Sequence, residues 1–204
     1  MHEVTSAPTT SRLLFLRKFL RSGRVAAVTP SSRPLAEALC REIDPRVPQN
    51  IVELGAGTGA VTSIACRRMH PKSRIISLEI DRQFAAITAA RCPRAEVVVD
   101  DVGNLDHWLQ ERGMGQIDLM ICCLALPGLP RATNAAVLDC LARRGPRAGF
   151  TQLTLVPLIY RRMYVRMFQE VRFSLVFRNL PPGGAYYCRG LRDNYAAHVP
   201  GKSA

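Results

Sequence analysis

The stretch from Ile51 to Ala60 reads I-V-E-L-G-A-G-T-G-A. Apolar residues lead into three glycines at alternate positions, Gly55, Gly57 and Gly59, and a helical pattern follows at once. The stretch therefore predicts a buried strand, a tight glycine turn and a helix. Glycine is needed in such a turn because the backbone angles exclude other residues, and because the missing side chain lets a ligand approach the backbone.

Two classes of ligand use such a turn, and a carboxylate distinguishes them. Gly55, Gly57 and Ala60 also fit the G-x-G-x-x-G/A pattern of dinucleotide sites, so the glycines alone are a weak signal. Glu53 lies at the expected mouth of the turn, where its charge would repel a pyrophosphate but attract the cationic end of a methionine moiety. The string E-L-G-A-G-T-G resembles motif I of class I S-adenosylmethionine-dependent methyltransferases. A dinucleotide site or a vestigial turn is the alternative.

This resemblance implies an α/β, Rossmann-like fold with S-adenosylmethionine as the cofactor. We expect a mostly parallel seven-stranded sheet that ends in an antiparallel hairpin, preceded by an N-terminal amphipathic helical extension. The residues expected to hold the methionine part of the cofactor at the turn are Glu53, Gly55, Ala56, Gly57 and Gly59.

The composition indicates a basic globular protein. The chain has 204 residues, enough for one α/β domain with a modest extension, and 48% of them are hydrophobic. The formal net charge of +12 predicts an anionic partner, either nucleic acid or a membrane surface, and does not say which.

The cysteines and the apolar segments indicate in which cellular compartment the protein resides. Seven cysteines are scattered without a C-x-x-C pair or a histidine cluster, which indicates reduced thiols in a cytosolic protein and no metal site. No apolar segment reaches the roughly 18 to 20 residues of a membrane span, and we expect no signal peptide.

A basic amphipathic helix is predicted over residues 11–24, S-R-L-L-F-L-R-K-F-L-R-S-G-R. Its cations lie away from the Leu and Phe side chains, and no acid occurs between Val4 and Ala36. Such a helix can lie in the interface of an anionic bilayer, where each cation adds roughly 1 kcal/mol. Alternatively its Leu and Phe pack on the core. The expected membrane contacts are Arg17, Lys18, Arg21 and Arg24.

A second helix is predicted from P-L-A-E-A-L-C-R-E-I, which ends before the Asp44-Pro45 pair. Ser31 or Ser32 can cap it, and either could also hold the phosphate or carboxylate of a head group. We expect residues 1–46 to form an N-terminal addition able to cover the cofactor cleft, residues 47–190 to form the methyltransferase domain, and residues 191–204 to be a disordered tail.

A second acid follows the second predicted strand, R-I-I-S-L-E-I-D. Glu79 stands about twenty residues beyond the glycines, where adenosine-binding α/β folds place a carboxylate that accepts both ribose hydroxyls. A helix cap is the alternative for an acid here, and it fits Asp81 better. We include the adjacent Ile80 in the expected cofactor site.

The methyltransferase resemblance implies further residues of the site. An acid after the third strand would bind the adenine amino group, and the matching positions are Asp101 and Val102, with Asp100 as the alternative acid. The end of the fourth strand, I-D-L-M-I-C-C-L, would face the transferable methyl group. We therefore expect a reaction pocket lined by Cys122, Cys123, Leu124 and Ala125, with Cys122 also touching the cofactor; a buried strand end is the alternative.

The C-terminal third contains a stripe of aromatic and methionine residues between Pro157 and Glu170, at helical spacing and interleaved with arginines. Such a stripe is usually core, and a second lipid-facing surface is the alternative. The segments S-L-V-F-R-N-L, P-P-G-G and A-Y-Y-C-R then predict a closing antiparallel hairpin.

Taken together, residues 13 to 190 resemble the small bacterial phospholipid N-methyltransferases, which are related in fold to ribosomal RNA adenine dimethylases. The resemblance is carried by F-L-R-K-F-L-R-S-G-R-V-A-A-V-T-P-S-S-R-P-L-A, E-L-G-A-G-T-G, C-C-L-A-L-P-G-L-P and F-R-N-L-P-P. It implies methylation of the amine of phosphatidylethanolamine or of an ornithine lipid, at the inner face of the cell membrane. The family often has Ser-Gly-Leu-Pro where Cys122 to Ala125 stand and a tyrosine where Leu155 stands, which leaves the head group open.

Two other functions are alternatives to lipid N-methylation. RNA adenine methylation would explain the charge, but adenine-modifying relatives carry an N/D-P-P-Y/F-like tetrapeptide after the fourth strand, and C-L-A-L stands here. We therefore expect no nucleic-acid partner. The third function is a non-catalytic membrane-surface protein that retains the cofactor fold. The sequence leaves open how many methyl groups are added and what the oligomeric state is. It also leaves the general base open, for which Tyr160 and Tyr186 are candidates.

Overall fold

The computed structural model describes residues 32–156, 159–179 and 182–202. The predicted basic helix over residues 11–24, with Arg17, Lys18, Arg21 and Arg24, and the capping candidate Ser31 lie outside these residues.

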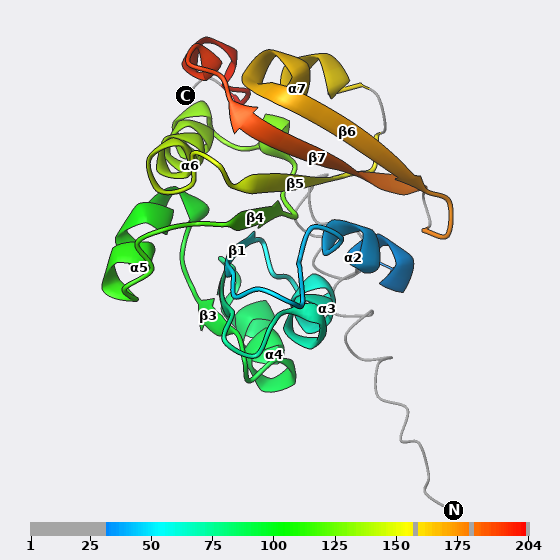
Figure 1. Ribbon diagram of the computed structural model, residues 1–204, viewed down its shortest axis with the longest axis vertical. Coiled ribbons are helices and arrows are strands. Elements are labelled where there is room, and N and C mark those ends of the chain that lie inside the picture. Colours follow the sequence, from blue (N-terminus) through cyan, green and yellow to red (C-terminus); the bar gives the residue numbers. More distant parts are fainter. Residues whose placement is uncertain (1–31, 157–158, 180–181, 203–204) are drawn as a thin grey trace, which may run out of the picture.

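One seven-stranded sheet organises the described chain, with the strand order β3-β2-β1-β4-β5-β7-β6 (Figure 1). Strands β1 to β5 pair in parallel, and β7 pairs antiparallel with both β5 and β6. The predicted parallel sheet with an antiparallel hairpin is therefore confirmed. The strands are β1 (Asn50–Leu54), β2 (Arg74–Leu78), β3 (Glu96–Val98), β4 (Leu119–Cys122), β5 (Gly149–Thr154), β6 (Phe168–Val176) and β7 (Gly183–Leu191).

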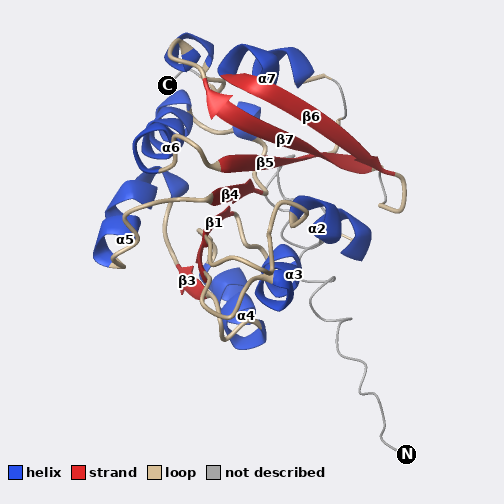
Figure 2. Ribbon diagram, in the orientation of Figure 1, coloured by secondary structure: helices blue, strands red, loops and turns tan. Residues whose placement is uncertain are grey.

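Helices cover both faces of the sheet (Figure 2). Side chains of α2 and α3 join one buried cluster, and side chains of α5, α6 and α7 join the other. The helices are α2 (Arg33–Leu39), α3 (Ala60–Arg68), α4 (Arg82–Arg91), α5 (Leu105–Glu111), α6 (Arg131–Arg144) and α7 (Arg161–Met167), with 3-10 turns η1 (Val102–Asn104), η2 (Leu126–Gly128) and η3 (Tyr195–His198).

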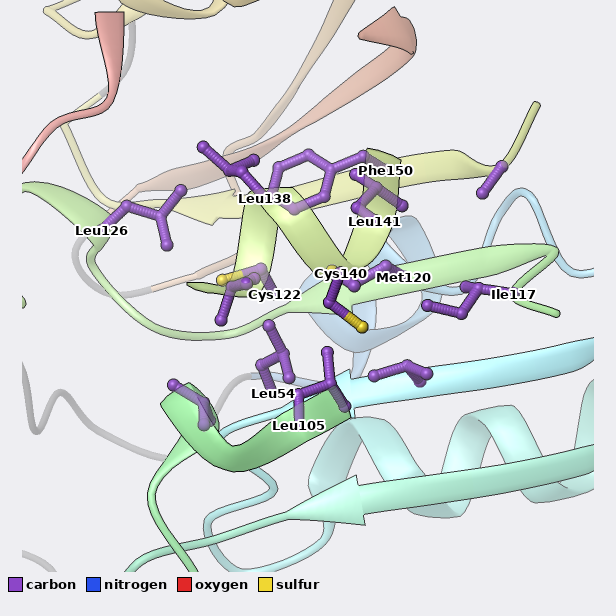
Figure 3. Packing of buried hydrophobic residues seen from close by; sticks show 14 of the residues in the cluster. Leu54, Leu105, Ile117, Met120, Cys122, Leu126, Leu138, Cys140, Leu141 and Phe150 are labelled. Atoms are coloured by element: carbon purple, nitrogen blue, oxygen red, sulfur yellow. The ribbon is translucent and has the colours of Figure 1, made fainter. Parts of the chain in front are cut away.

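The central strands are apolar on both faces because both faces are covered. Ile51, Val52 and Leu54 of β1 are fully buried, as is every residue of β4. Figure 3 shows the packing against α5 and α6, where side chains from the end of β4, from β5 and from the two helices interlock. This packing fixes where the carboxyl ends of the strands lie, and hence where the loops after them meet.

Helix α2 is part of this core and is not a detachable cover. Leu35 and Leu39 are fully buried against the same cluster as Ile51, and the Tyr187 hydroxyl of β7 donates a hydrogen bond to the Ala38 carbonyl at 2.8 Å. This differs from the expected boundary at residue 46. The apolar face of α2 closes one side of the sheet, so it folds with the domain.

The tail after Leu191 is ordered as far as Lys202, which differs from the disorder we expected. The Tyr195 hydroxyl donates to the Asp139 carboxylate at 2.6 Å, and the Asn134 amide donates to the Pro200 carbonyl at 2.9 Å. Asn134 and Asp139 both lie on α6, so polar contacts with α6 hold the tail against the domain. No local sequence pattern predicts these contacts.

The aromatic stripe between Pro157 and Glu170 is core, as expected, but its helix is shorter than the stripe. Helix α7 ends at Met167, and Phe168 begins β6, where its ring stacks on Phe150 with centroids 5.2 Å apart. Tyr164, Met167 and Phe168 are all buried. Pairing of Phe168 with β7 overrides the helical spacing.

Candidate active site

The carboxyl ends of β1, β2, β3 and β4 lie at one edge of the sheet, because these strands are parallel neighbours. The loops that follow them contain nearly all the site residues expected from the sequence. In addition, Ser32 lies at the start of α2, where its hydroxyl accepts a hydrogen bond from the Leu35 amide at 3.4 Å and caps the helix.

The glycine turn between β1 and α3 has the predicted form. Gly55, Gly57 and Gly59 have φ angles of 80°, 55° and 79°, in the left-handed region that favours glycine. The amides of Gly55 and Ala56 both donate to the Leu78 carbonyl, at 2.8 and 3.2 Å. This ties the turn to the end of β2. A Cβ at Gly55 would overlap the side chain of Leu124, so the turn also packs tightly on the loop after β4.

Helix α4 holds the outer side of this turn, through contacts that no sequence motif predicts. The Thr88 hydroxyl donates to the Gly57 carbonyl, and the Arg91 guanidinium donates to the Thr58 carbonyl, both at 2.9 Å. Thr88 and Arg91 are the seventh and the last residue of α4, and the sequence of this helix shows no motif. Only the packing of α4 on the turn reveals their contacts.

Glu53 is fully buried beneath the turn, deeper than the mouth position that the sequence predicted. The hydroxyls of Thr62 and Ser77 both donate to its Oε2, at 2.7 and 2.6 Å, whereas its Oε1 is buried without a hydrogen-bond partner. Burial raises the pKa of Glu53 to about 7, against the opposing effect of the two hydroxyls. A buried acceptor without a partner is costly, and it suits a ligand that brings a cationic N–H group.

Glu79 joins the glycine turn to the loop after β2. Its Oε2 accepts from the Gly57 amide at 2.8 Å and its Oε1 accepts from the Asp81 amide at 3.0 Å. The side chain of the next residue, Ile80, is 68% exposed at the same edge. Asp81 accepts from the amides of the first turn of α4, so the cap lies at Asp81 and leaves Glu79 for the ligand edge.

The two acids after β3 have different surroundings. Asp100 accepts hydrogen bonds from the Trp108 indole at 2.7 Å and from the Asn104 side chain at 3.0 Å, and these bonds lower the pKa of Asp100. Asp101 is exposed and uses its Oδ1 to accept from the Gly103 amide at 2.7 Å. Asp100 therefore holds α5 in place, and Asp101 presents a carboxylate oxygen to solvent.

The loop after β4 divides into buried and open residues. Cys122 is fully buried among the residues of Figure 3, and burial raises the pKa of its thiol to about 12. It does not line an open pocket as we expected, because the last residue of a central strand has neighbours on both faces. Cys123 and Leu124 are partly exposed and Ala125 is exposed.

The carbonyl of Leu124 is fixed by two donors. The Gln152 side chain donates to it at 2.7 Å from the neighbouring strand β5, and the Cys122 thiol donates to it at 3.6 Å. No motif in the sequence marks Gln152. Its register beside Cys122 is what brings it to the loop, and that register becomes visible only in the assembled sheet.

Similarity to known proteins shows the family of the chain. No model of a protein family matches the chain. The chain is 39% identical over 187 residues to an ornithine lipid N-methyltransferase from Singulisphaera acidiphila, and the match covers 89% of this chain and 97% of that protein. The chain belongs to the ornithine lipid N-methyltransferase family. It is therefore an S-adenosylmethionine-dependent lipid N-methyltransferase, and the dinucleotide alternative is excluded.

Solved structures agree on the fold of this N-methyltransferase. An O-methyltransferase from Bacillus cereus, in complex with SAH, superposes with a TM-score of 0.60 at 15% identity, covering 91% of this chain and 93% of that one.

A second relative by sequence matches only part of the chain. A ribosomal RNA small subunit methyltransferase A from Acidobacterium capsulatum is 32% identical over 100 residues, but these are 42% of this chain and 34% of that protein. No helix within the described residues is both long and apolar enough to span a bilayer.

Proposed function

We propose that this chain transfers methyl groups from S-adenosylmethionine to the primary amine of an ornithine lipid. The observation that carries the proposal is the 39% identity to the ornithine lipid N-methyltransferase, in a match that covers 89% of this chain and 97% of that protein. Phosphatidylethanolamine, which the sequence left open as the acceptor, has no such support among the relatives. The rRNA methyltransferase matches over only a third of its own length, so it lends RNA little support.

The residues present fit the cofactor. The buried Oε1 of Glu53 can accept the ammonium group of the methionine part, and that part can lie against the glycine turn, whose positive φ angles at Gly55 and Gly57 suit glycine. The lone pairs left on Glu79 can accept the ribose hydroxyls, and the exposed Ile80 can cover the adenine ring. When bound, S-adenosylmethionine supplies an electrophilic methyl group on a sulfonium.

The protein's own contribution to the chemistry is alignment and exclusion of water. Cys123, Leu124 and Ala125 form an apolar wall at the edge where the methyl group would face the acceptor. A primary amine has a pKa of about 10 in water, and a drier, apolar site favours its neutral, nucleophilic form. Tyr186 is fully buried between Tyr164 and Phe173, with ring centroids 4.8 Å from each, so it cannot reach the amine as a base.

Two variants after β3 test which acid contacts the adenine of the cofactor. We expect Asp101→Asn to weaken S-adenosylmethionine binding about tenfold, because the amide keeps the bond to Gly103 but replaces an acceptor with a donor toward the adenine amino group. Asp100→Asn should instead lower the free energy of unfolding by about 1–2 kcal/mol, through loss of the Trp108 bond, and leave affinity unchanged. Calorimetric titration and urea denaturation separate the two effects. The reverse pattern would assign the adenine contact to Asp100.

We further propose that the enzyme works at the inner face of the membrane, as a peripheral protein. The support is the sequence of residues 11–24, whose cations Arg17, Lys18, Arg21 and Arg24 favour an anionic surface, together with the net charge of +12. A lipid acceptor with its acyl chains in the bilayer would require the same location. This proposal includes no nucleic-acid partner.

The acceptor is tested with purified protein and methyl-labelled S-adenosylmethionine. Vesicles that contain ornithine lipid, vesicles that contain phosphatidylethanolamine, and ribosomal RNA are offered in parallel. We expect label on ornithine lipid, with phosphatidylethanolamine labelled more slowly or not at all and the RNA unlabelled. Label on RNA alone would overturn the proposal, and label on phosphatidylethanolamine in preference would correct the head group.

A further inference from the structure

Two segments that are distant in sequence meet at the edge of the sheet that carries the candidate active site. Strand β5 is parallel to β4 and ends there at Thr154, which pairs with Gly184 near the start of β7. Gly184 in turn pairs with Leu175 near the end of β6. The tip of the β6–β7 hairpin and the chain leaving β5 therefore stand side by side at this edge, as Figure 1 shows.

These two segments expose large apolar side chains. Ile159, before α7, is 69% exposed, and Phe177, just after β6, is 76% exposed. Val156 and Leu175 beside them are 42% and 40% exposed. We call these four residues the apolar rim. Single exposed apolar residues are ordinary, but a group at one edge indicates a surface that contacts something apolar.

The charges around the apolar rim are of one sign. Arg161 and Arg162 follow Ile159, Arg178 follows Phe177, and all three side chains are exposed. Between Leu155 and Arg192 the chain has a single acid, Glu170, which lies opposite Arg189 in the register of β6 and β7. Apolar side chains flanked by arginines match the interface of an anionic bilayer, where the arginines meet phosphates and the apolar side chains enter the acyl boundary.

We propose that the apolar rim is the surface by which the enzyme docks on an anionic lipid bilayer, with Ile159 and Phe177 inserted below the head groups. This inference rests on the proposed function, since a lipid acceptor must reach the same edge of the sheet. It differs from the contact expected of residues 11–24, because it is formed by the folded domain and sets the orientation of the active site. With the rim inserted, the loops after β1, β2 and β4 face the membrane.

The test compares Ile159→Asp, Phe177→Asp and the double variant with Val47→Asp. Val47 is 48% exposed and lies just before β1, at the opposite edge of the sheet, so it is a matched control for a new surface charge. Binding is measured by co-sedimentation with vesicles of phosphatidylcholine and phosphatidylglycerol. Methylation is measured on ornithine lipid in such vesicles and on a short-chain, water-soluble ornithine lipid.

We expect each rim variant to bind vesicles about tenfold more weakly and the double variant more weakly still, since each loses an apolar insertion. Methylation in vesicles should fall in parallel, whereas affinity for S-adenosylmethionine and the rate on the water-soluble lipid should match those of the wild type. Val47→Asp should behave as the wild type throughout.

Other outcomes would overturn the inference. Unchanged vesicle binding, or an equal loss in Val47→Asp, would show that the rim does not dock. A loss of rate on the water-soluble lipid would make the rim part of the acceptor site instead. A rim that holds two copies together would give a lipid-free dimer that the double variant dissociates. A wild-type protein that binds vesicles but methylates neither lipid would refute the proposed function while leaving the docking surface supported.

Discussion

Replacement of Glu53 by glutamine is expected to weaken S-adenosylmethionine binding by at least about 100-fold. The buried Oε1 has no hydrogen-bond partner, and the ammonium group of the methionine part is the cation that would satisfy it. Removing one member of a buried ion pair costs about 3 kcal/mol or more, because the other charge is left without compensation. Glutamine keeps the size of the side chain and can still accept from Thr62 and Ser77.

Calorimetric titration of the purified variant measures this effect directly. Glu37→Gln is the control: Glu37 pairs with Arg33 on the exposed face of α2, at 2.8 Å, and its loss should leave affinity unchanged. If Glu53→Gln bound S-adenosylmethionine within threefold of the wild type, Glu53 could not be the residue that holds the methionine part.

The same carboxyl should make the cofactor-free protein less stable as the pH rises. Burial raises the pKa of Glu53 from 4.5 to about 7 in the folded state. Below pH 4.5 the group is protonated in both states and has no effect. Between pH 4.5 and 7 the unfolded chain loses the proton while the folded protein keeps it. The free energy of unfolding therefore falls through this window, by about 3 kcal/mol in all.

Urea denaturation of the wild type and of Glu53→Gln at pH 5, 6, 7 and 8 isolates this contribution, because every other titrating group is common to both. The wild type should lose stability relative to the variant between pH 5 and pH 7 and change little relative to it between pH 7 and pH 8. Saturating S-adenosylmethionine should abolish the difference in the wild type, since the ammonium group stabilises the ionised carboxyl. A constant difference at all four pH values would mean that Glu53 is ionised throughout.

The sequence predicts the sheet and the glycine turn well because both depend on local rules. Alternate glycines after an apolar run require positive φ angles, and Gly55, Gly57 and Gly59 adopt them. The position of Glu79 follows from the same logic, whereas its contact with the ribose stays a prediction. The end of β2 lies beside the end of β1, so an acid at Glu79 must reach the turn, and its carboxylate accepts the Gly57 amide.

The parts that the sequence did not predict depend on contacts between distant segments. The depth of Glu53 is set by Thr62 and Ser77, one on the next helix and one on the neighbouring strand. Cys122 is core because α6 and η2 close over the end of β4, which no spacing within the strand reveals. Asp100 and Asp101 differ in their surroundings because the Trp108 indole donates a hydrogen bond to Asp100 alone.

Contacts between distant segments also explain why both ends of the domain are ordered where the sequence predicted an addition and a disordered tail. Helix α2 looks like an addition in the sequence because it precedes the first strand, yet its buried face packs on β1, α3 and β7. The segment after Leu191 is polar and short, which resembles a frayed terminus, but Asn134 and Asp139 of α6 hold it. A polar segment is ordered when it finds fixed partners, and those partners belong to another part of the chain.

A mass spectrum of cellular lipids shows whether the chain methylates ornithine lipid. The protein is expressed in a bacterium that lacks lipid methyltransferases of its own, with and without co-produced ornithine lipid. We expect mass steps of one, two or three methyl groups on ornithine lipid, and their loss in Glu53→Gln. An unchanged lipid spectrum, from cells in which the protein is folded and binds S-adenosylmethionine, would contradict it.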